Sequence, residues 1–407
     1  MAFSARQGFT AETEPERAVA DIVRQIGAPD LDAVFFFCSP RYDLPALGRE
    51  LQRAFACPVI GCSSAGQIGQ GGFQRGGMNA LGLGGGQVRV VPQLIQPLAD
   101  YQVQANRVAA AFRDLAAGAG EAHGFGLLLV DGLSMMEERL TSALYQALDN
   151  IPIIGGSAGD DLRFQRTQVY FDGQFRSDAA VLAACLARGP IAPFMLGHFV
   201  PTGARLVITD SDEERRIIRE FNGEPAASAY AEAIGADPAA LGPELFSRHP
   251  LLLGIGGEQY VRAIARVHAD QSLALYCAIE TGLVVTIGQS IDPVAALERA
   301  LEGALARVQE PVAILVCDCI LRRLEFENLG IDQRVGALMA RHRVFGFSTY
   351  GEQFNGVHLN QTLTGIVLGA SREDGVGRLC LRTSWGSKGE HRERSEQAVP
   401  TFMTVLP

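Results

Sequence analysis

The chain has 407 residues, which is too long for one ordinary hydrophobic core and indicates two or three domains. With 47% hydrophobic and 20% charged residues, its composition is that of a globular protein and excludes a disordered or fibrous one. A formal net charge of -10, without a long Lys/Arg cluster, excludes a nucleic-acid-binding function that neutralises phosphates.

The sequence also predicts where the protein resides. The first twenty residues contain acids and lack the apolar segment of a signal peptide, and no apolar run is long enough to span a membrane. The 8 cysteines follow no disulfide-framework spacing, which favours free thiols in a reducing compartment. We therefore expect a cytoplasmic protein with no membrane contact.

Three stretches repeat one pattern of predicted elements. Each reads as an apolar strand, an amphipathic helix, a strand ending in Gly-x-Ser, a polar turn and another strand. The copies span residues 33–86, 124–187 and 311–370. Their strands are short runs rich in Val, Ile and Phe, as expected for strands with both faces buried.

Aligning the three copies on a shared glycine also aligns a serine two residues later. The aligned pairs are Gly61 and Ser63, Gly155 and Ser157, and Gly346 and Ser348. The repeat predicts an α/β fold, specifically an α+β layered sandwich of duplicated strand–helix–strand modules with sheets packed between helices. Because ligands bind at strand ends in such sheets, the turns after these serines are predicted to be equivalent sites at sheet edges.

The stretch between the second and third copies has a different character. Residues 205–219 are predicted to form a strand, a turn and the start of a helix, and short helices and hairpin-like strands follow. A boundary near residue 220 gives four parts: an N-terminal extension (1–29), two domains (30–220 and 221–370) and a C-terminal strand or tail (371–407).

Three strings resemble the signature segments of FIST domain proteins: GCSSAGQI, GGSAGDD and FGFSTYGEQFNGVHLNQTLTGIVLG. The resemblance covers roughly residues 30–370 and implies that the two domains are an N-terminal and a C-terminal FIST domain. It further implies a bacterial, intracellular sensor in signal transduction that binds a small ligand and is not an enzyme. Because the chain carries no kinase motifs, the output is expected in a separate partner protein. The oligomeric state stays open, with a homo-oligomer among the alternatives.

A FIST protein of this size also resembles the NosP-type nitric-oxide-sensing haemoproteins of the family. That resemblance implies haem b as cofactor and nitric oxide as the signal. The implied partner is a histidine kinase, or a diguanylate cyclase or phosphodiesterase that acts on cyclic dinucleotides.

His358 is the best single candidate for a cofactor or metal ligand. It lies between apolar residues at the start of a predicted strand, and histidine is the usual proximal ligand of haem iron. The alternative is a core histidine that bonds a backbone carbonyl. Its neighbours are predicted to line a pocket, although a solvated loop would contain the same residue types; they are Tyr350, Glu352, Gln353, Phe354, Asn355 and Asn360.

The segment Gly155–Gly159 matches the Gly-x-Ser-x-Gly pattern of hydrolases, in which a helix follows the serine directly. Here the following residues predict a turn and a strand, so Ser157 and Asp160 are expected at a ligand-facing or packing turn. Ser63 and Ser64 belong to the same class of position. A hydrolase using Ser157, or an enzyme using Asp160 and Glu352, remains an alternative.

Other residues have simpler explanations. Cys317 and Cys319 are expected to be buried strand thiols, since no second cysteine pair completes a zinc site. Glu137 is expected to form a capping box with Ser134 at the start of a helix. Two further hypotheses remain: an amino-acid or metabolite sensor without haem, and a scaffold with no ligand.

Overall fold

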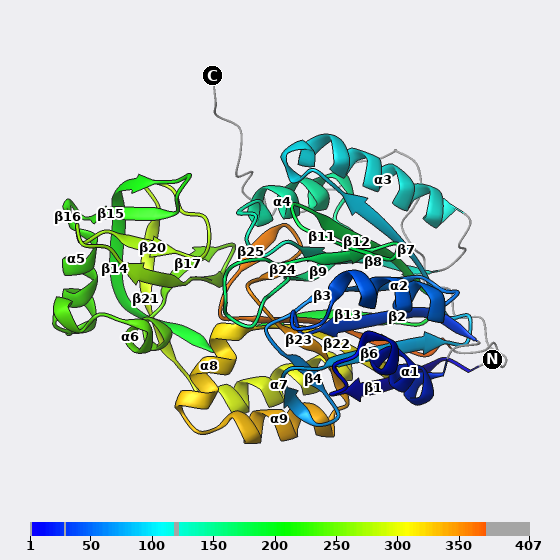
Figure 1. The fold of residues 1–407 in the computed structure, drawn as a ribbon. Coiled ribbons are helices and arrows are strands. Elements are labelled where there is room, and N and C mark those ends of the chain that lie inside the picture. Colours follow the sequence, from blue (N-terminus) through cyan, green and yellow to red (C-terminus); the bar gives the residue numbers. More distant parts are fainter. Residues whose placement is uncertain (1, 28–29, 118–121, 372–407) are drawn as a thin grey trace.

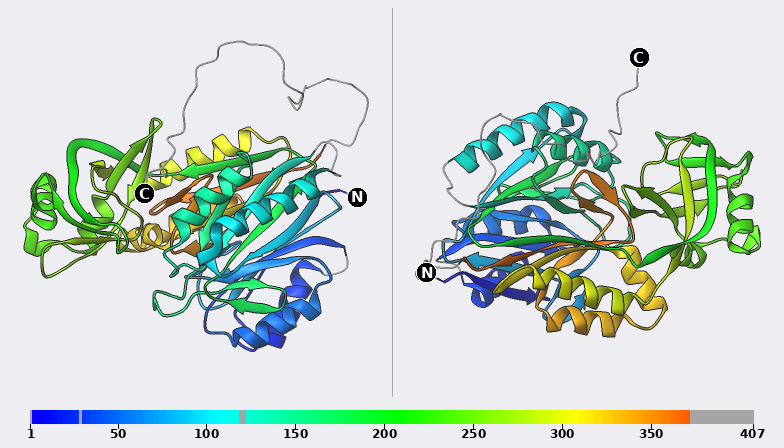
Figure 2. Two further views of the ribbon diagram at one scale, coloured as in Figure 1. Left: turned by 90° about the horizontal axis from the view of Figure 1, so that it is seen from above. Right: turned by 180° about the vertical axis from the view of Figure 1, so that it is seen from behind.

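The computed structural model describes residues 2–27, 30–117 and 122–371 of the chain. Three sheets lie side by side with helices on their outer sides, and a smaller β-rich lobe projects from one side (Figures 1 and 2). The predicted layering of sheets and helices is confirmed. Within the described ranges, none of the helices is both long and apolar enough to span a membrane.

Each of the three sheets is built mainly from one repeat unit, and the units share one order of elements. Unit 1 contains β1 (Ser4–Thr10), α1 (Pro15–Ile26), β2 (Leu31–Cys38), α2 (Leu44–Ala54), β3 (Val59–Ser63), β4 (Gln67–Gly69), β5 (Gly72–Gln74) and β6 (Met78–Gly84). Unit 2 contains β7 (Val88–Ile95), α3 (Tyr101–Ala117), β8 (His123–Val130), α4 (Glu137–Ala147), β9 (Ile153–Ser157), β10 (Val169–Phe171), β11 (Gln174–Arg176) and β12 (Ala180–Ala187). Unit 3 contains β13 (Ile191–Leu196), α7 (Pro293–Ala306), β22 (Pro311–Cys319), α8 (Ile320–Asn328), α9 (Asp332–Arg341), β23 (Val344–Thr349), β24 (Glu352–Phe354), β25 (Val357–Leu359) and β26 (Leu363–Gly369).

The centre of each unit is one parallel strand pair: β2 with β3, β8 with β9, and β22 with β23. The glycines aligned from the sequence occupy the same place in these pairs. A Cβ on Gly61, Gly155 or Gly346 would lie 2.3, 2.2 or 2.0 Å from a carbonyl oxygen of the neighbouring parallel strand. Only glycine permits this approach, which explains why the residue recurs at this position.

The units are joined by an exchange of hairpins. The hairpin β4–β5 of unit 1 pairs with β23 of unit 3, and the hairpin β24–β25 of unit 3 pairs with β9 of unit 2. The hairpin β10–β11 of unit 2 then pairs with β3 of unit 1, which closes the ring. Each parallel pair therefore has its open edge covered by another unit.

An apolar core fills the centre of this ring. It combines side chains from all three sheets, including Phe37 of β2, Leu129 of β8 and Cys317 of β22. The rings of Phe37 and Phe347 stack with their centroids 4.0 Å apart, across the first and third units. Separate apolar clusters on the outer faces bury α1 and α2, α3 and α4, and α7 to α9.

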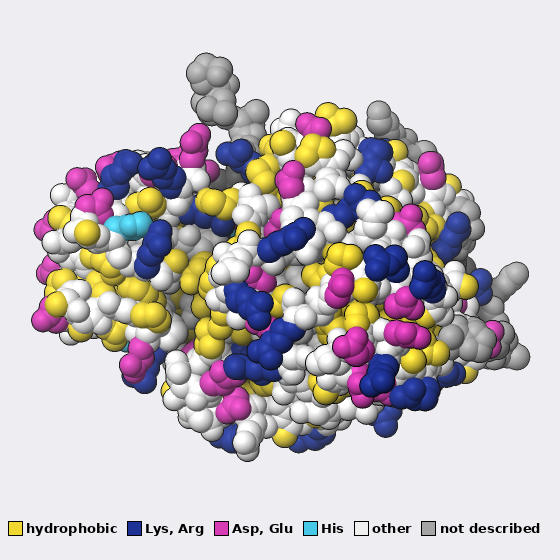
Figure 3. Space-filling model, viewed as in Figure 1, with side chains coloured by type: hydrophobic (Ala, Val, Ile, Leu, Met, Phe, Trp, Pro, Cys, Tyr) yellow, Lys and Arg dark blue, Asp and Glu magenta, His cyan; other side chains and the backbone are white. Residues whose placement is uncertain are grey.

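The lobe is an insertion in unit 3, between β13 and α7. Its elements are β14 (Phe199–Asp212), β15 (Ile217–Phe221), β16 (Glu224–Pro225), α5 (Ala226–Ile234), α6 (Pro243–Arg248), β17 (Leu251–Ile255), β18 (Glu258–Arg262), β19 (Ile264–Val267), β20 (Leu273–Leu275) and β21 (Val284–Ser290). These strands form one sheet around a separate apolar cluster. In Figure 3 the lobe stands apart from the ring, with an indentation in the outline between them.

One predicted element is a different element in the structure. The helix start expected before residue 219 is wrong, because the charged stretch is a turn leading into β15. Position 220 lies inside β15, and residues 4–26 supply β1 and α1 of unit 1. The expected C-terminal strand or tail lies outside the described residues, apart from Ser371.

Replacing Phe37 by alanine is expected to lower the free energy of unfolding by about 3–5 kcal/mol, because it opens a cavity between two sheets. Urea unfolding followed by circular dichroism measures the change. Val103→Ala, at a side chain that is 74% exposed on α3, is the control and should change little. An equal effect of both substitutions would contradict a shared central core.

Candidate functional site

Several predicted residues meet where the hairpin β24–β25 covers the end of β9. The Nε2 of Gln353 donates to the Oγ of Ser157 at 2.9 Å and to the Nδ1 of His358 at 3.2 Å. Both amide hydrogens are thereby used, and the Oε1 of Gln353 has no hydrogen-bond partner among the described residues. All three side chains are buried.

The position of His358 favours its neutral form. Nδ1 accepts a hydrogen bond and so carries no proton, which leaves the proton on Nε2. Burial lowers the pKa of His358 to about 4; nearby Glu138 opposes this shift, while Arg216 and Arg262 add to it. The imidazole of His358 is therefore uncharged at neutral pH.

Glu352 is a buried carboxyl beside this cluster. Thr349 donates its hydroxyl to one carboxyl oxygen, and Thr362 donates its hydroxyl to the other at 2.7 Å. Burial nevertheless raises the pKa of Glu352 to about 8, with Asp318 adding to the shift. Its role is to tie the hairpin to the ends of β23 and β26.

Asn360 follows β25 and is completely buried. Neither its Oδ1 nor its Nδ2 has a hydrogen-bond partner among the described residues. It is next to His358: a Cβ built on Gly351 would touch both the His358 ring and Asn360 Nδ2, at 2.4 and 3.1 Å. A buried amide left unbonded costs about 1–3 kcal/mol, so this residue requires an explanation beyond packing.

The lobe contacts the ring at this same place. Arg216, in the turn between β14 and β15, donates to Glu137 at 2.9 Å and to Glu138 at 2.7 Å, and both acids begin α4. Glu138 also accepts from the backbone N–H of Ala278 at 2.7 Å. We call Arg216, Glu137 and Glu138 the clamp, since they hold the lobe against unit 2.

The two acids of the clamp differ in their protonation. Burial raises the pKa of Glu137 to about 7, although Arg216 opposes this. Burial would also raise the pKa of Glu138, but the attraction of its carboxylate to a protonated His358 and to Arg216, together with the Ala278 N–H, lowers it. Glu138 is therefore the ionised partner on which Arg216 depends at every pH near neutrality.

Two further contacts connect the lobe to the segment around His358. Arg262 of β18 donates to the backbone oxygen of His358 at 3.5 Å, and its Nε has no partner among the described residues. Gln361 donates to the backbone oxygen of Ser247 in α6 at 3.1 Å. The hairpin β24–β25 and the residues after it thus lie between ring and lobe.

The two linkers of the lobe are held by a buried network on α8. His198, after β13, contacts Glu325 through Nε2 at 2.8 Å and Arg322 through Nδ1 at 2.7 Å. Arg322 pairs with Asp318 at 2.6 Å, and the backbone oxygen of His198 accepts from Ile291 in the other linker at 2.8 Å. We call these side chains the linker network.

Asp160 and Tyr350 form a separate arrangement beside the cluster. Asp160 accepts the backbone N–H groups of Phe164, Gln165 and Arg166 and the hydroxyl of Tyr350. These bonds lower the pKa of Asp160 despite its burial. Its carboxylate therefore organises the loop between β9 and β10.

The remaining predicted residues do not join the His358 cluster. Ser63 accepts from the N–H of Gln168 at 3.0 Å, and Ser64 accepts from Gln67 at 2.9 Å, both at other hairpin junctions of the ring. Phe354 packs against the central core. Asn355 has a positive φ of 53° and occupies the hairpin turn, where asparagine is a common residue.

Comparison with known proteins identifies the two parts of the chain. Residues 32–224 match the FIST N domain, and residues 226–355 match the FIST C domain. The chain belongs to the FIST family. FIST domains are small-ligand sensor domains found in signalling proteins.

The other comparisons give no information on the activity of the FIST protein. No curated protein matches its sequence. A crystal structure of a chorismatase is similar with a TM-score of 0.34 and 11% identity, covering 90% of this chain and 99% of that chain. A similarity of this size carries no argument about activity.

Haem does not fit His358 of the FIST protein in this arrangement. His358 is only 2% exposed. Its Nδ1 is hydrogen-bonded to Gln353, and a Cβ on Gly351 would lie 2.9 Å from its Nε2. An iron ion on Nδ1 would have to displace Gln353, and one on Nε2 would have to displace the Gly351 turn. A porphyrin would also need an open space beside the imidazole. Among the described residues, no group of three or more His, Cys, Asp and Glu side chains is placed to hold a metal ion.

The surroundings of Ser157 differ from those of a nucleophile. A loop, and not a helix, connects β9 to β10, and the Oγ of Ser157 accepts a hydrogen bond from Gln353. His358 lies on the far side of the same amide, which separates it from the serine. A general base would need to accept the serine proton directly or through one water.

Sequence reasoning missed the charged residues around His358. It explained Glu137 as part of a capping box with Ser134, which is wrong: α4 begins after Met136 without a side-chain cap, and Glu137 binds Arg216. Arg216 lies in a run of charged residues, 79 and 78 residues from the two acids, so no local pattern in the sequence indicates which carboxyls it binds.

We expect His358→Gln to remove a pH dependence of stability. Because the folded protein holds His358 neutral with a pKa of about 4, against 6.5 when unfolded, stability is lost as pH falls between these values. The wild type should lose about 3 kcal/mol more than the variant from pH 6.5 to pH 4, measured by urea unfolding. The exposed His123→Gln is the control, and a constant difference between wild type and His358→Gln would contradict the assignment.

Arg216→Met is expected to reduce the free energy of unfolding by about 3–5 kcal/mol, since it leaves two buried carboxyls without their cation. The loss should become smaller at acid pH, where Glu137 and Glu138 are protonated. Arg219→Met is the matched control: Arg219 pairs with Asp210 and Asp212 but is 48% exposed, so it should cost at most about 1 kcal/mol. Equal losses for both variants would show that the clamp is no more than a surface ion pair.

Proposed function

We propose that the FIST protein is a small-ligand sensor whose site lies between the ring and the lobe, at Asn360, Gln353 and Arg262. The observation that carries this proposal is the completely buried Asn360, whose amide has two unbonded atoms. The unbonded Oε1 of Gln353 and Nε of Arg262 lie on the segments beside it. Together they offer donors and acceptors to a small polar molecule.

The position of these groups supports a sensing mechanism. Asn360 and Gln353 belong to the ring, and Arg262 belongs to the lobe, which contacts the backbone of His358. A ligand bound by both parts stabilises the arrangement in which they are close. A partner that contacts the lobe then reads the shift between the two arrangements.

Membership of the FIST family supports a proposal for the partner and the compartment. We infer that a separate histidine kinase or cyclic-dinucleotide enzyme receives the signal and that the protein itself performs no catalysis. The cytoplasm is the compartment we propose, and the free thiols of the seven described cysteines support it. An amino acid or a similar polar metabolite is the ligand we favour, since haem does not fit His358 as it is packed.

Asn360→Leu tests the site without knowledge of the ligand. Leucine has a similar size and removes the unbonded amide, so the variant is expected to be more stable than wild type by about 1–3 kcal/mol in urea unfolding. Asn328→Leu, at an exposed position at the end of α8, is the control. A large loss of stability in Asn360→Leu would mean that the amide is satisfied in the folded protein, and would contradict the proposal.

Ligand binding is then tested with the twenty amino acids and with haem. An amino acid that raises the melting temperature of wild type, but not of Asn360→Leu, supports the site. A haem Soret band that is present in wild type and lost in His358→Ala would mean that the ligand is haem and not a metabolite. The Gly351 turn would then have to move to admit the haem. No binding of either kind to a folded protein favours the scaffold hypothesis instead.

A further inference from the structure

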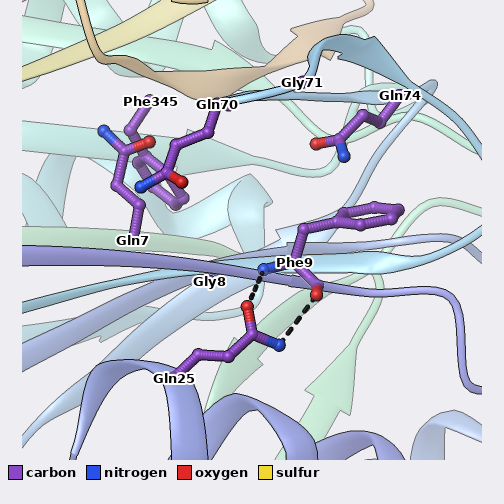
Figure 4. A pocket seen from close by; sticks show the side chains of 9 residues that line it. Gln7, Gly8, Phe9, Gln25, Gln70, Gly71, Gln74 and Phe345 are labelled. Atoms are coloured by element: carbon purple, nitrogen blue, oxygen red, sulfur yellow. Dashed lines mark hydrogen bonds between the residues drawn. The ribbon is translucent and has the colours of Figure 1, made fainter.

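A second place in the ring has the properties of a binding site. A pocket of about 100 Å³ lies where β1, the hairpin β4–β5 and the start of β23 meet (Figure 4). Its side chains are four glutamines and two phenylalanines: Gln7, Gln25, Gln70, Gln74, Phe9 and Phe345. Phe345 lies near the start of β23, whereas Thr349, which contacts Glu352, lies at its end. The pocket is thus distinct from the His358 cluster.

Two glutamine oxygens face each other across this pocket. Gln7 donates its Nε2 to the backbone oxygen of Arg343 at 2.6 Å, which fixes the amide, and its Oε1 lies on the side of Gly69. Both Gln7 Oε1 and Gln74 Oε1 are buried and have no hydrogen-bond partner among the described residues. Figure 4 shows them on opposite sides of the pocket.

Gly69 leaves the space between the two oxygens open. A Cβ on this residue would lie 3.4 Å from Gln74 Oε1 and 4.0 Å from Gln7 Oε1. These are ordinary contact distances, and the backbone of Gly69 is in a strand, so the fold admits a Cβ at this position, beside the two oxygens. Because Gly69 has no side chain, it does not fill the space beside these two buried acceptors.

The chemistry of the lining defines what can bind. The acceptors require hydrogen-bond donors, either N–H or O–H, because a buried carbonyl without a partner is unfavourable. No charged side chain lines the pocket, so selection depends on hydrogen bonding and size. The rings of Phe9 and Phe345 provide apolar walls, on which a planar guanidinium or amide packs better than a hydrated ammonium.

We propose that this pocket binds a planar group rich in N–H donors, a primary amide or a guanidinium, through Gln7 and Gln74. The volume admits a group of a few heavy atoms and excludes a haem or a nucleotide. Such a group contacts unit 1 through β1 and β4–β5, and unit 3 through Phe345. Its binding therefore strengthens one of the three junctions of the ring, independently of the ligand proposed above.

Saturation-transfer NMR with the full chain tests the proposal, using N-methylguanidinium and acetamide as probes. Tetramethylammonium and acetate, which lack N–H donors, are the negative probes. We expect saturation transfer to at least one donor probe and to neither negative probe, with a dissociation constant of about 1 mM, as befits a ligand this small. Guanidinium and amide are distinguished by which probe shows the larger effect.

Two variants keep the test specific. Gln74→Met removes one acceptor without adding charge and should weaken binding about fivefold, while Gly69→Val fills the space and should abolish it. Gln102→Met, at an exposed position on α3, is the matched control and should bind as wild type does. Each variant is first shown to fold by circular dichroism. Binding that is unaffected by both pocket substitutions, equal transfer to tetramethylammonium, or no transfer to either donor probe would overturn the proposal, and none of these results bears on Asn360.

Discussion

The exchange of hairpins between units is the constraint on which the rest of the structure depends. A parallel strand pair such as β2–β3 leaves one edge open, and an unpaired edge in the middle of a protein is a liability. Each unit covers that edge with a hairpin from another unit, so none of the three sheets is complete alone. Because the ring closes on itself, additional chain is tolerated only outside it, and the lobe enters between β13 and α7.

The same constraint explains why one junction differs from the other two. All three aligned serines lie beside an incoming hairpin, and Ser63 is bonded to the backbone of its hairpin. At Ser157 the partner is a side chain, Gln353, which also holds His358. This hairpin lies against the lobe, whose Arg262 reaches the backbone of His358. The three repeat units have three similar strand ends. The lobe packs against one of them, so that polar groups from two parts of the chain meet there.

Local patterns in the sequence predicted what local physics determines. The repeat, the buried strands and the Gly-x-Ser turns were visible because glycine is required where Gly61, Gly155 and Gly346 approach a neighbouring carbonyl. His358, Gln353 and Ser157 were predicted as site residues and do meet. The pairing partners of the hairpins were not predictable, since a short strand such as β24 carries no information on which edge it joins. Arg216 and Glu137 were missed for the same reason, as only the fold brings them together.

The two attachments of the lobe differ in a way that decides how it can move. The side chains of His198 and Arg322 in the linker network are completely buried, and separating them would leave buried polar groups without their hydrogen-bond partners. In the clamp, Glu137 and Arg216 are also buried, but the Glu138 side chain is 22% exposed, so water can solvate one of the two carboxyls when Arg216 moves away. A displacement of the lobe would therefore open at the clamp and rotate about the linkers. Asn360 lies next to His358, near the side at which the lobe would separate from the ring. A ligand bound there would therefore have the largest effect on the position of the lobe.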